Sequence, residues 1–152
     1  MITDDIRQKL NEAVVEVFGT MYFTPVDLLS EVPSENQWHL QDRYIKAVIA
    51  YTGPLAAQME LYFPFSLGSN IAAGFLGIDP EKLNEKQIVD TMREAANMIV
   101  GSLLGKLDPH GDCKLGIPAA EMVKDYSPQS VPPGSTALAF ISDFGLMWVF
   151  FK

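Results

Sequence analysis

The sequence predicts an α+β fold in which two long helices and a short helix pack on a largely antiparallel sheet. Two observations carry this prediction. Residues 4–18 and 84–107 place apolar side chains at helical spacing, and residues 43–63 and 136–151 each contain two β-rich segments separated by turn residues. The chain has 152 residues, which fits one domain, 1–152, with a core of its own.

Composition and charge narrow the class of protein. Hydrophobic residues make up 48 % of the chain, as in globular proteins. The net charge is −8 and no Lys/Arg cluster is present, so general electrostatic binding to nucleic acid or anionic membranes is not expected. No apolar run approaches a membrane span, the acidic N-terminus is not a secretory signal, and Cys113 has no cysteine partner. We therefore expect a cytoplasmic protein without membrane insertion.

The first helix is expected to begin after Thr3, whose hydroxyl suits an N-cap, and to run to about Phe18. Gly19 then marks its end. Residues 24–41 contain prolines among polar residues and are interpreted as a loop or short irregular pieces.

A hairpin follows, with strands at residues 43–51 and 55–63 joined by Thr52–Pro54. The second strand alternates, which predicts buried Ala57, Met59, Leu61 and Phe63 and wet Gln58, Glu60 and Tyr62. A short helix capped by Ser66 and ended near Gly77 comes next. Four apolar residues are expected on its inner side: Leu67, Ile71, Phe75 and Leu76.

The C-terminal third is predicted to be mostly strand and loop. Cys113–Ile117 is a candidate strand that Pro118 limits to an edge or ends, and residues 125–135 form a loop. Thr136–Ser142 and Leu146–Phe151 then form a hairpin. The last strand is apolar at nearly every position, so it needs cover on both faces, or it is an edge that another subunit covers. The sequence leaves monomer and homodimer open.

The long helix has the clearest local signals. Asn84 and Gln87 form a capping-box pattern, so the helix should begin at about Glu85 and continue to Leu107. One apolar stripe of this helix is expected to face the core: Val89, Met92, Ala96, Ile99, Val100 and Leu103.

A second stripe lies on the opposite face of the same helix. It consists of Asp90, Glu94, Asn97 and Gly101, at spacings of four, three and four. Asn in a helix interior costs up to ~0.7 kcal/mol relative to Ala, so Asn97 does not favour the helix. A solvated helix face also needs polar residues, and the stripe alone does not separate this interpretation from a functional site.

Most familiar catalytic patterns are absent from the sequence. His39 and His110 lie in separate loops without metal-ligand spacing, and Cys113 lies in an apolar strand. There is no Gly-x-Ser-x-Gly motif, phosphate-binding glycine loop or Rossmann pattern. If the protein is an enzyme, its chemistry must come from a carboxylate, a carboxamide and groups that the substrate brings.

The stretch Asp90-x-x-x-Glu94-x-x-Asn97-Met-Ile-Val-Gly101 resembles the signature of the CheC/CheX/FliY family of bacterial chemotaxis phosphatases. The similarity extends to residues 63–77, to Gly116-Ile-Pro118 and to the order of the elements. Pro118 is the candidate for a proline that the family pattern has downstream of the asparagine. Only one Glu-x-x-Asn helix is present, so the chain resembles the single-site, CheX-like branch and its fold.

The resemblance implies a hydrolase that removes the phosphoryl group from the aspartate of a CheY-type response regulator. Asn97 would position the attacking water, Glu94 would pair with a lysine of the receiver domain, and Asp90 and Gly101 would support docking. The chain would need no cofactor, because the response regulator carries Mg²⁺. The alternative is a non-catalytic receiver-binding or signalling interaction module that uses the same helix face. A third possibility is an α+β domain whose second stripe is merely solvated.

Overall fold

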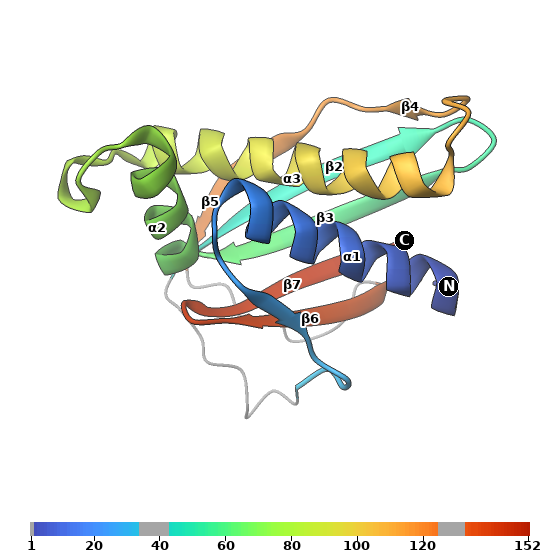
Figure 1. Ribbon diagram of the computed structural model, residues 1–152, viewed down its shortest axis with the longest axis horizontal. Helices are drawn as coiled ribbons and strands as arrows, with labels where there is room; N and C mark the ends of the chain where they lie inside the picture. Colours follow the sequence, from blue (N-terminus) through green and yellow to red (C-terminus); the bar gives the residue numbers. More distant parts are fainter. Residues whose placement is uncertain (1, 34–42, 125–132) are drawn as a thin grey trace.

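The computed structural model describes residues 2–33, 43–124 and 133–152 and confirms the α+β fold (Figure 1). The helices are α1 (Asp4–Met21), α2 (Phe65–Leu76) and α3 (Glu85–Leu107), with a short 3₁₀ turn η2 (Pro80–Lys82) before α3. No helix in these ranges is both long and apolar enough to cross a membrane.

Within the described residues, seven strands form one antiparallel sheet, and six of them follow the order β1-β6-β7-β3-β2-β4. Strand β5 also pairs with β2, along its first part from Arg43 to Val48, whereas β4 pairs with the last two residues of β2. The strands are β1 (Val26–Leu28), β2 (Arg43–Thr52), β3 (Ala57–Pro64), β4 (Lys114–Leu115), β5 (Ala119–Lys124), β6 (Thr136–Ser142) and β7 (Gly145–Phe151). Both predicted hairpins, β2–β3 and β6–β7, are present.

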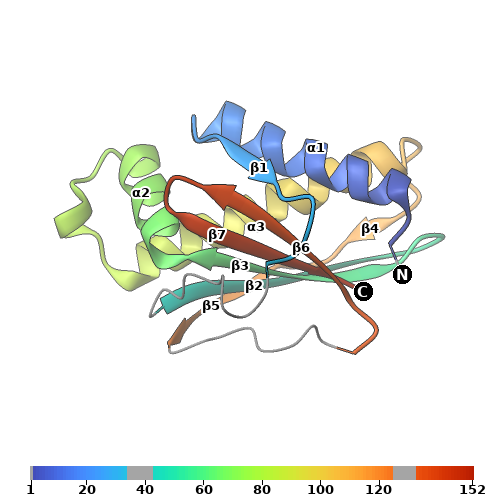
Figure 2. The same cartoon turned by 90° about the horizontal axis from the view of Figure 1, so that it is seen from below.

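All three helices lie on one face of the sheet (Figure 2). They bury the main core against that face, and a second apolar cluster lies on the other face. Strand β7 contributes to both, because Met147 and Val149 point into the main core while Trp148 and Phe150 belong to the second cluster. The prediction that this strand is covered on both faces is therefore confirmed.

The alternative prediction for the last strand, an edge that another subunit covers, is wrong. Strand β7 lies between β6 and β3 and pairs with both of them. Its backbone groups are used within the chain, so they are not open to a second subunit. Strand β7 therefore gives no support for a homodimer, which remains a prediction.

Helix α1 begins as predicted but ends later. The Thr3 hydroxyl accepts a hydrogen bond from the backbone N–H of Ile6 at 3.2 Å. The helix passes through Gly19 to Met21 and is capped by Tyr22, whose N–H donates to the Phe18 carbonyl at 3.3 Å. The rings of Phe18 and Tyr22 lie 6.0 Å apart, so a packing contact favours the extra turn over the stop that Gly19 suggested.

Two short strands form at positions where no strand is predicted. The segment interpreted as a loop at 24–41 contains β1, which pairs with β6. Strand β5 forms directly after Pro118, whereas the predicted strand at Cys113–Ile117 is only the two-residue β4. Strands β1 and β5 are edge elements that depend on a partner strand rather than on their own propensity. Residues 34–42 and 125–132 lie outside the described part.

Helix α2 starts differently from the prediction. Its N-cap is Pro64, with no side-chain hydrogen bond, whereas the Ser66 hydroxyl donates to the carbonyl of Phe144 at 2.8 Å. Ser66 therefore ties α2 to the β6–β7 turn instead of capping the helix. The end is as predicted, because Gly77 adopts the left-handed conformation with φ of 66°.

Three apolar or aromatic side chains have a burial opposite to the prediction. Phe75 and Leu76, expected on the inner side of α2, are 55 % and 42 % exposed. Leu67 and Ile71 are buried as expected. Tyr62, expected on the wet face of β3, is buried in the second apolar cluster. The second face of the sheet is covered, which alternation in one strand does not reveal.

Two glycines of α2 should respond in opposite ways to alanine. A Cβ at Gly68 would lie 2.8 Å from Ile45 Cδ1 and 3.2 Å from both Ile88 and Met92, all buried, whereas a Cβ at Gly74 would meet nothing within 4 Å. We expect Gly68→Ala to lower the free energy of unfolding by about 1–3 kcal/mol. Gly74→Ala should raise it by about 0.5–1 kcal/mol, because Gly is unfavourable inside helices.

Urea unfolding of the two variants beside the parent measures both changes. Equal stability of the two variants would contradict the close packing of α2 on α3 at Gly68.

Candidate functional site

Helix α3 carries the candidate site, and its register follows from a capping box and a buried face. The Asn84 side chain accepts from the Gln87 N–H at 2.8 Å, and the Gln87 side chain accepts from the Asn84 N–H at 3.0 Å. The helix therefore begins where the sequence predicted. Its buried residues are Ile88, Thr91, Met92, Ala95, Ala96, Ile99, Val100, Leu103 and Leu104. Val89, predicted to be buried, is partly buried and packs against the core.

The polar stripe, defined as Asp90, Glu94, Asn97 and Gly101, lies on the face of α3 turned away from the sheet. Glu94 is exposed and the other three are partly exposed. Helix α1 packs along one side of α3, while β4 and β5 contact the other side (Figure 1). The stripe is thus an open ridge with a neighbouring element on each side.

Asp90 is already paired on its own helix. Its carboxylate oxygens lie 2.7 Å from Lys86 Nζ and 3.1 Å from an Arg93 guanidinium nitrogen. The hydrogen bond from Lys86, with the charges of Lys86 and Arg93, holds the pKa of the Asp90 carboxyl below its ordinary value. The Asp90 carboxylate is therefore not an open position for a cation of a partner.

Glu94 differs from Asp90, although both are carboxylates of one stripe. Within the described residues it forms no ion pair and no hydrogen bond. Its charge acts on Tyr22 at the end of α1. Burial, and after it the charge of Glu94, raises the pKa of the Tyr22 phenol to about 12. The exposed Glu94 carboxylate is thus close enough to the end of α1 to act on Tyr22, and it is open to a cation.

Asn97 lies three residues after Glu94, so the two side chains project side by side from one rigid helix. The carboxamide of Asn97 makes no hydrogen bond to the described parts of the chain. It offers a donor and an acceptor that do not titrate. The pair provides a charged group for docking and a neutral group that can orient a small molecule.

Gly101 ends the stripe beside β4. A Cβ at this position would lie 3.6 Å from Leu115 Cδ2, which is ordinary van der Waals contact. An alanine would fit there, and the element packed against Gly101 is a strand rather than a helix. Close approach of a partner to Gly101 stays a prediction.

Gly116-Ile117-Pro118 forms the link between β4 and β5. The N–H of Gly116 donates to the Ala50 carbonyl at 2.7 Å, and a Cβ on Gly116 would lie 2.9 Å from that oxygen. Only glycine permits this approach to β2. Pro118 follows in the same link, and Ile117 is 94 % exposed. The equivalence of Pro118 to the proline of the family pattern stays a prediction.

The described residues contain no group of three or more His, Cys, Asp or Glu side chains placed to hold a metal ion. His110 lies in the loop after α3, where Asp108 accepts a hydrogen bond from the N–H of Cys113 at 2.7 Å. Asp108 thus has a structural role in shaping this loop. His39 lies outside the described residues.

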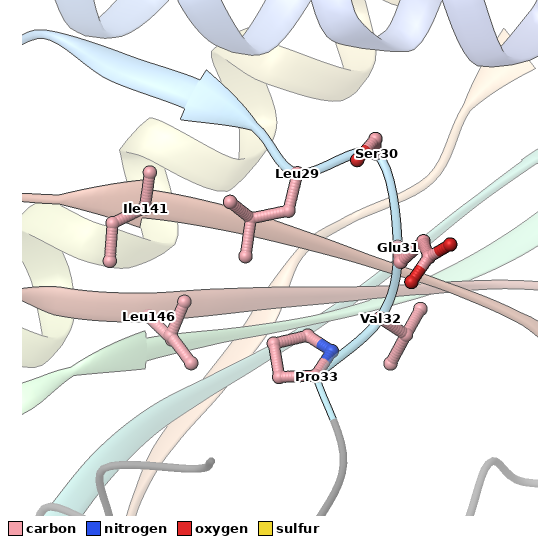
Figure 3. A pocket seen from close by; sticks show the side chains of 7 residues that line it. All are labelled: Leu29, Ser30, Glu31, Val32, Pro33, Ile141 and Leu146. Atoms are coloured by element: carbon pink, nitrogen blue, oxygen red, sulfur yellow. The ribbon is translucent and has the colours of Figure 1, made fainter.

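A cavity of about 340 Å³ lies elsewhere, beside β6 and β7 (Figure 3). Its lining comes from the segment after β1 and from the β6–β7 hairpin: Leu29, Ser30, Glu31, Val32, Pro33, Ile141 and Leu146. No member of the polar stripe contributes to it. The candidate site is therefore a surface and not this cavity.

Sequence reasoning missed the aromatic residues beside the stripe. Tyr22 lies next to Glu94 and stacks edge-on against Phe75 of α2, with ring centroids 5.8 Å apart. Tyr22 and Phe75 are 53 residues apart, so spacing could not bring them together. The available signal was the aromatic pair Tyr22-Phe23 directly after a helix, where a polar end would be usual.

Comparison with known proteins identifies relatives by family and by fold. The model of the chemotaxis phosphatase CheX family matches residues 45–139. No curated protein matches the sequence. The CheX structure from Desulfovibrio desulfuricans is similar with a TM-score of 0.75 and 18 % identity, over 97 % of this chain and 98 % of that one. The CheX structure from Vibrio vulnificus gives 0.76 and 18 %, over 97 % of both chains.

A third similar structure is a complex of CheX with CheY, BeF₃ and Mg²⁺ from Borrelia burgdorferi. Its TM-score is 0.70 at 14 % identity, over 99 % of this chain and 98 % of that chain. At these identities the structures establish a shared fold, while the family match rests on the sequence.

The Tyr22 pKa of about 12, against an ordinary 10.0, has a testable cause. The folded state holds the phenolic proton more tightly, so stability is full below pH 10 and falls as the pH rises towards 12. Glu94→Gln removes the charge contribution. We expect it to lower the Tyr22 pKa while leaving it above 10.0, because burial is the larger cause.

Phenolate absorbance during an alkaline titration, with Tyr22→Phe subtracted, measures this pKa. Glu85→Gln, which removes a carboxylate from the start of α3, is the matched control. An unchanged Tyr22 midpoint in Glu94→Gln would show that the two groups do not interact.

Proposed function

The chain belongs to the CheX family of chemotaxis phosphatases, and on this premise we propose that it hydrolyses the aspartyl-phosphate of a CheY-type response regulator. The observation that carries the proposal is the pair Glu94 and Asn97, three residues apart on one helix face. Glu94 is exposed, Asn97 is partly exposed, and neither forms a hydrogen bond or ion pair within the described residues. The similar CheX of Borrelia burgdorferi, solved with CheY, BeF₃ and Mg²⁺, supports the class of partner.

Asn97 positions the nucleophile in this proposal. Its carboxamide oxygen accepts a hydrogen bond from a water, which attacks phosphorus in line with the bond to the receiver aspartate. That P–O bond breaks, and the aspartate carboxylate leaves with the electron pair. The products are inorganic phosphate and the free receiver. Catalysis rests on orientation, since no side chain of this protein forms a covalent bond.

Glu94 sets the position of the receiver. Its exposed carboxylate pairs with a lysine of the receiver, and this charge-assisted contact fixes the register of Asn97 over the phosphoryl group. Asp90 supports docking indirectly, because it holds Lys86 and Arg93 on the same helix. Gly101 supports docking because it has no side chain that would keep the receiver away from the end of the stripe. Mg²⁺ belongs to the receiver, and no step depends on a metal held by this chain.

Replacement of Asn97 tests the catalytic assignment. We expect Asn97→Ala to reduce kcat for hydrolysis of a phosphorylated receiver by at least about 100-fold, because the water loses its orientation. The measurement is loss of aspartyl-phosphate from a panel of receiver domains in the presence of Mg²⁺. Thermal stability should be kept or slightly raised, since the side chain is not in the core and alanine favours the helix.

Ser102→Ala, on the same helix but about 140° around it from Asn97, is the control and should hydrolyse at the parental rate. Equal rates for parent and Asn97→Ala would overturn the role of Asn97. Receiver binding without hydrolysis by the parent would identify a non-catalytic receiver-binding module.

Replacement of Glu94 should affect binding more than turnover. We expect Glu94→Gln to raise KM for the receiver by about tenfold, because a charge-assisted contact is lost. The parental KM should rise with salt, and the salt dependence should be weaker in the variant. Asp90→Asn is the comparison carboxylate and should change KM less. A larger effect of Asp90→Asn than of Glu94→Gln would contradict the assignment of docking to Glu94.

A further inference from the structure

An aromatic ledge, defined as Tyr22, Phe23 and Phe75, lies where the end of α1 meets α2. Tyr22 and Phe75 stack edge-on at an interplanar angle of 69°. Phe75 is 55 % exposed and Phe23 is 87 % exposed. Met21 and Leu76, the neighbours of these residues in the chain, are also more than 40 % exposed. Phe23 and Phe75 are aromatic side chains that the protein's own core does not cover, whereas Tyr22 is partly buried and packs against Phe18 of the core.

Stability does not explain Phe23. Its backbone has φ of 51°, and it is the one non-glycine residue among those described with positive φ. This left-handed conformation after a helix is usually supplied by Gly, because a side chain is unfavourable there. The ring recovers little by burial, since it is almost fully exposed. A strained aromatic residue on the surface is better explained by a contact with another molecule.

The ledge and the polar stripe lie on neighbouring elements. Phe75 of α2 stacks on Tyr22 at the end of α1, α3 packs against both helices, and the Glu94 charge acts on the Tyr22 phenol. Helices α1 and α3 pack along each other, and Lys106 of α3 pairs with Glu16 of α1 at 3.3 Å. When a partner protein pairs a lysine with Glu94, the residues around that lysine therefore lie over the ledge.

We propose that the aromatic ledge is the affinity and selectivity part of the receiver-binding surface, and that it seats an apolar patch adjoining the lysine that pairs with Glu94. This inference rests on the proposed function. An exposed carboxylate beside aromatic rings suits a lysine, whose aliphatic stem packs on the rings while its ammonium reaches the carboxylate. Aromatic side chains beside a charged contact commonly dominate binding energy. The ledge thus sets KM and the choice of receiver, whereas Asn97 sets kcat.

The test compares Phe23→Gly and Phe75→Ala with the parent, using the receiver that the parent dephosphorylates fastest in the panel. Each variant is expected to raise KM about five- to tenfold, with kcat within about twofold of the parent. Phe23→Gly should keep or raise the Tm, because it relieves the left-handed backbone without removing a buried ring. A rise in KM without loss of stability is not expected of a merely structural residue.

Leu55→Ala is the matched control, because Leu55 is an exposed apolar residue (43 %) in the β2–β3 turn, at the opposite end of the sheet from α2 (Figure 1). It should leave KM unchanged. An unchanged KM in both ledge variants, with Asn97→Ala still inactive, would overturn the ledge and leave the proposed function standing. If the parent hydrolyses no receiver, the ledge is tested by binding. The Kd values of the parent and the ledge variants are then compared in titrations with receivers loaded with Mg²⁺ and beryllofluoride. Absence of binding to every receiver would overturn both.

Discussion

The structure depends first on burial of one face of α3 against the sheet. Met92, Ala96, Ile99 and Leu103 have no exposed surface, so the helix cannot rotate without exposing them. This constraint points Asp90, Glu94, Asn97 and Gly101 outward at the same time. The close contact of α2 at Gly68 with Ile88 and Met92 fixes the start of α3 in the same way. The geometry of the polar stripe is therefore a consequence of core packing, although none of its members belongs to the core.

The stripe contains two carboxylates in different surroundings because their neighbours differ. Asp90 has Lys86 four residues before it and Arg93 three residues after it, and both pair with it. Glu94 has no basic residue at these spacings and lies towards Tyr22 of α1. A docking carboxylate needs to be open before the partner arrives, since breaking an existing pair would cost part of the binding energy. The pattern of charges around α3 thus leaves one carboxylate open for a partner.

Local signals in the sequence located the parts that form the stripe. The Asn84–Gln87 capping box set the start of α3, and the apolar period set which face is buried. Other local signals were overruled by competing contacts, one within the same helix end and one from a distant segment. Gly19 did not end α1, because Tyr22 packs on Phe18, and Ser66 did not cap α2, because the Phe144 carbonyl takes its hydrogen bond. Strands β1 and β5 had no signal, since each exists through pairing with a longer neighbour.

The sequence by itself determined the α+β fold class, both hairpins, the register of α3 and the composition of its polar stripe. These follow from periodicity and capping, which act within one or two turns of the chain. Only the tertiary structure decided that β7 lies inside the sheet, that Phe75 is exposed and that Tyr22 borders Glu94. Such facts depend on which segments become neighbours after folding. Residues 53 positions apart, such as Tyr22 and Phe75, share no local pattern that spacing could reveal.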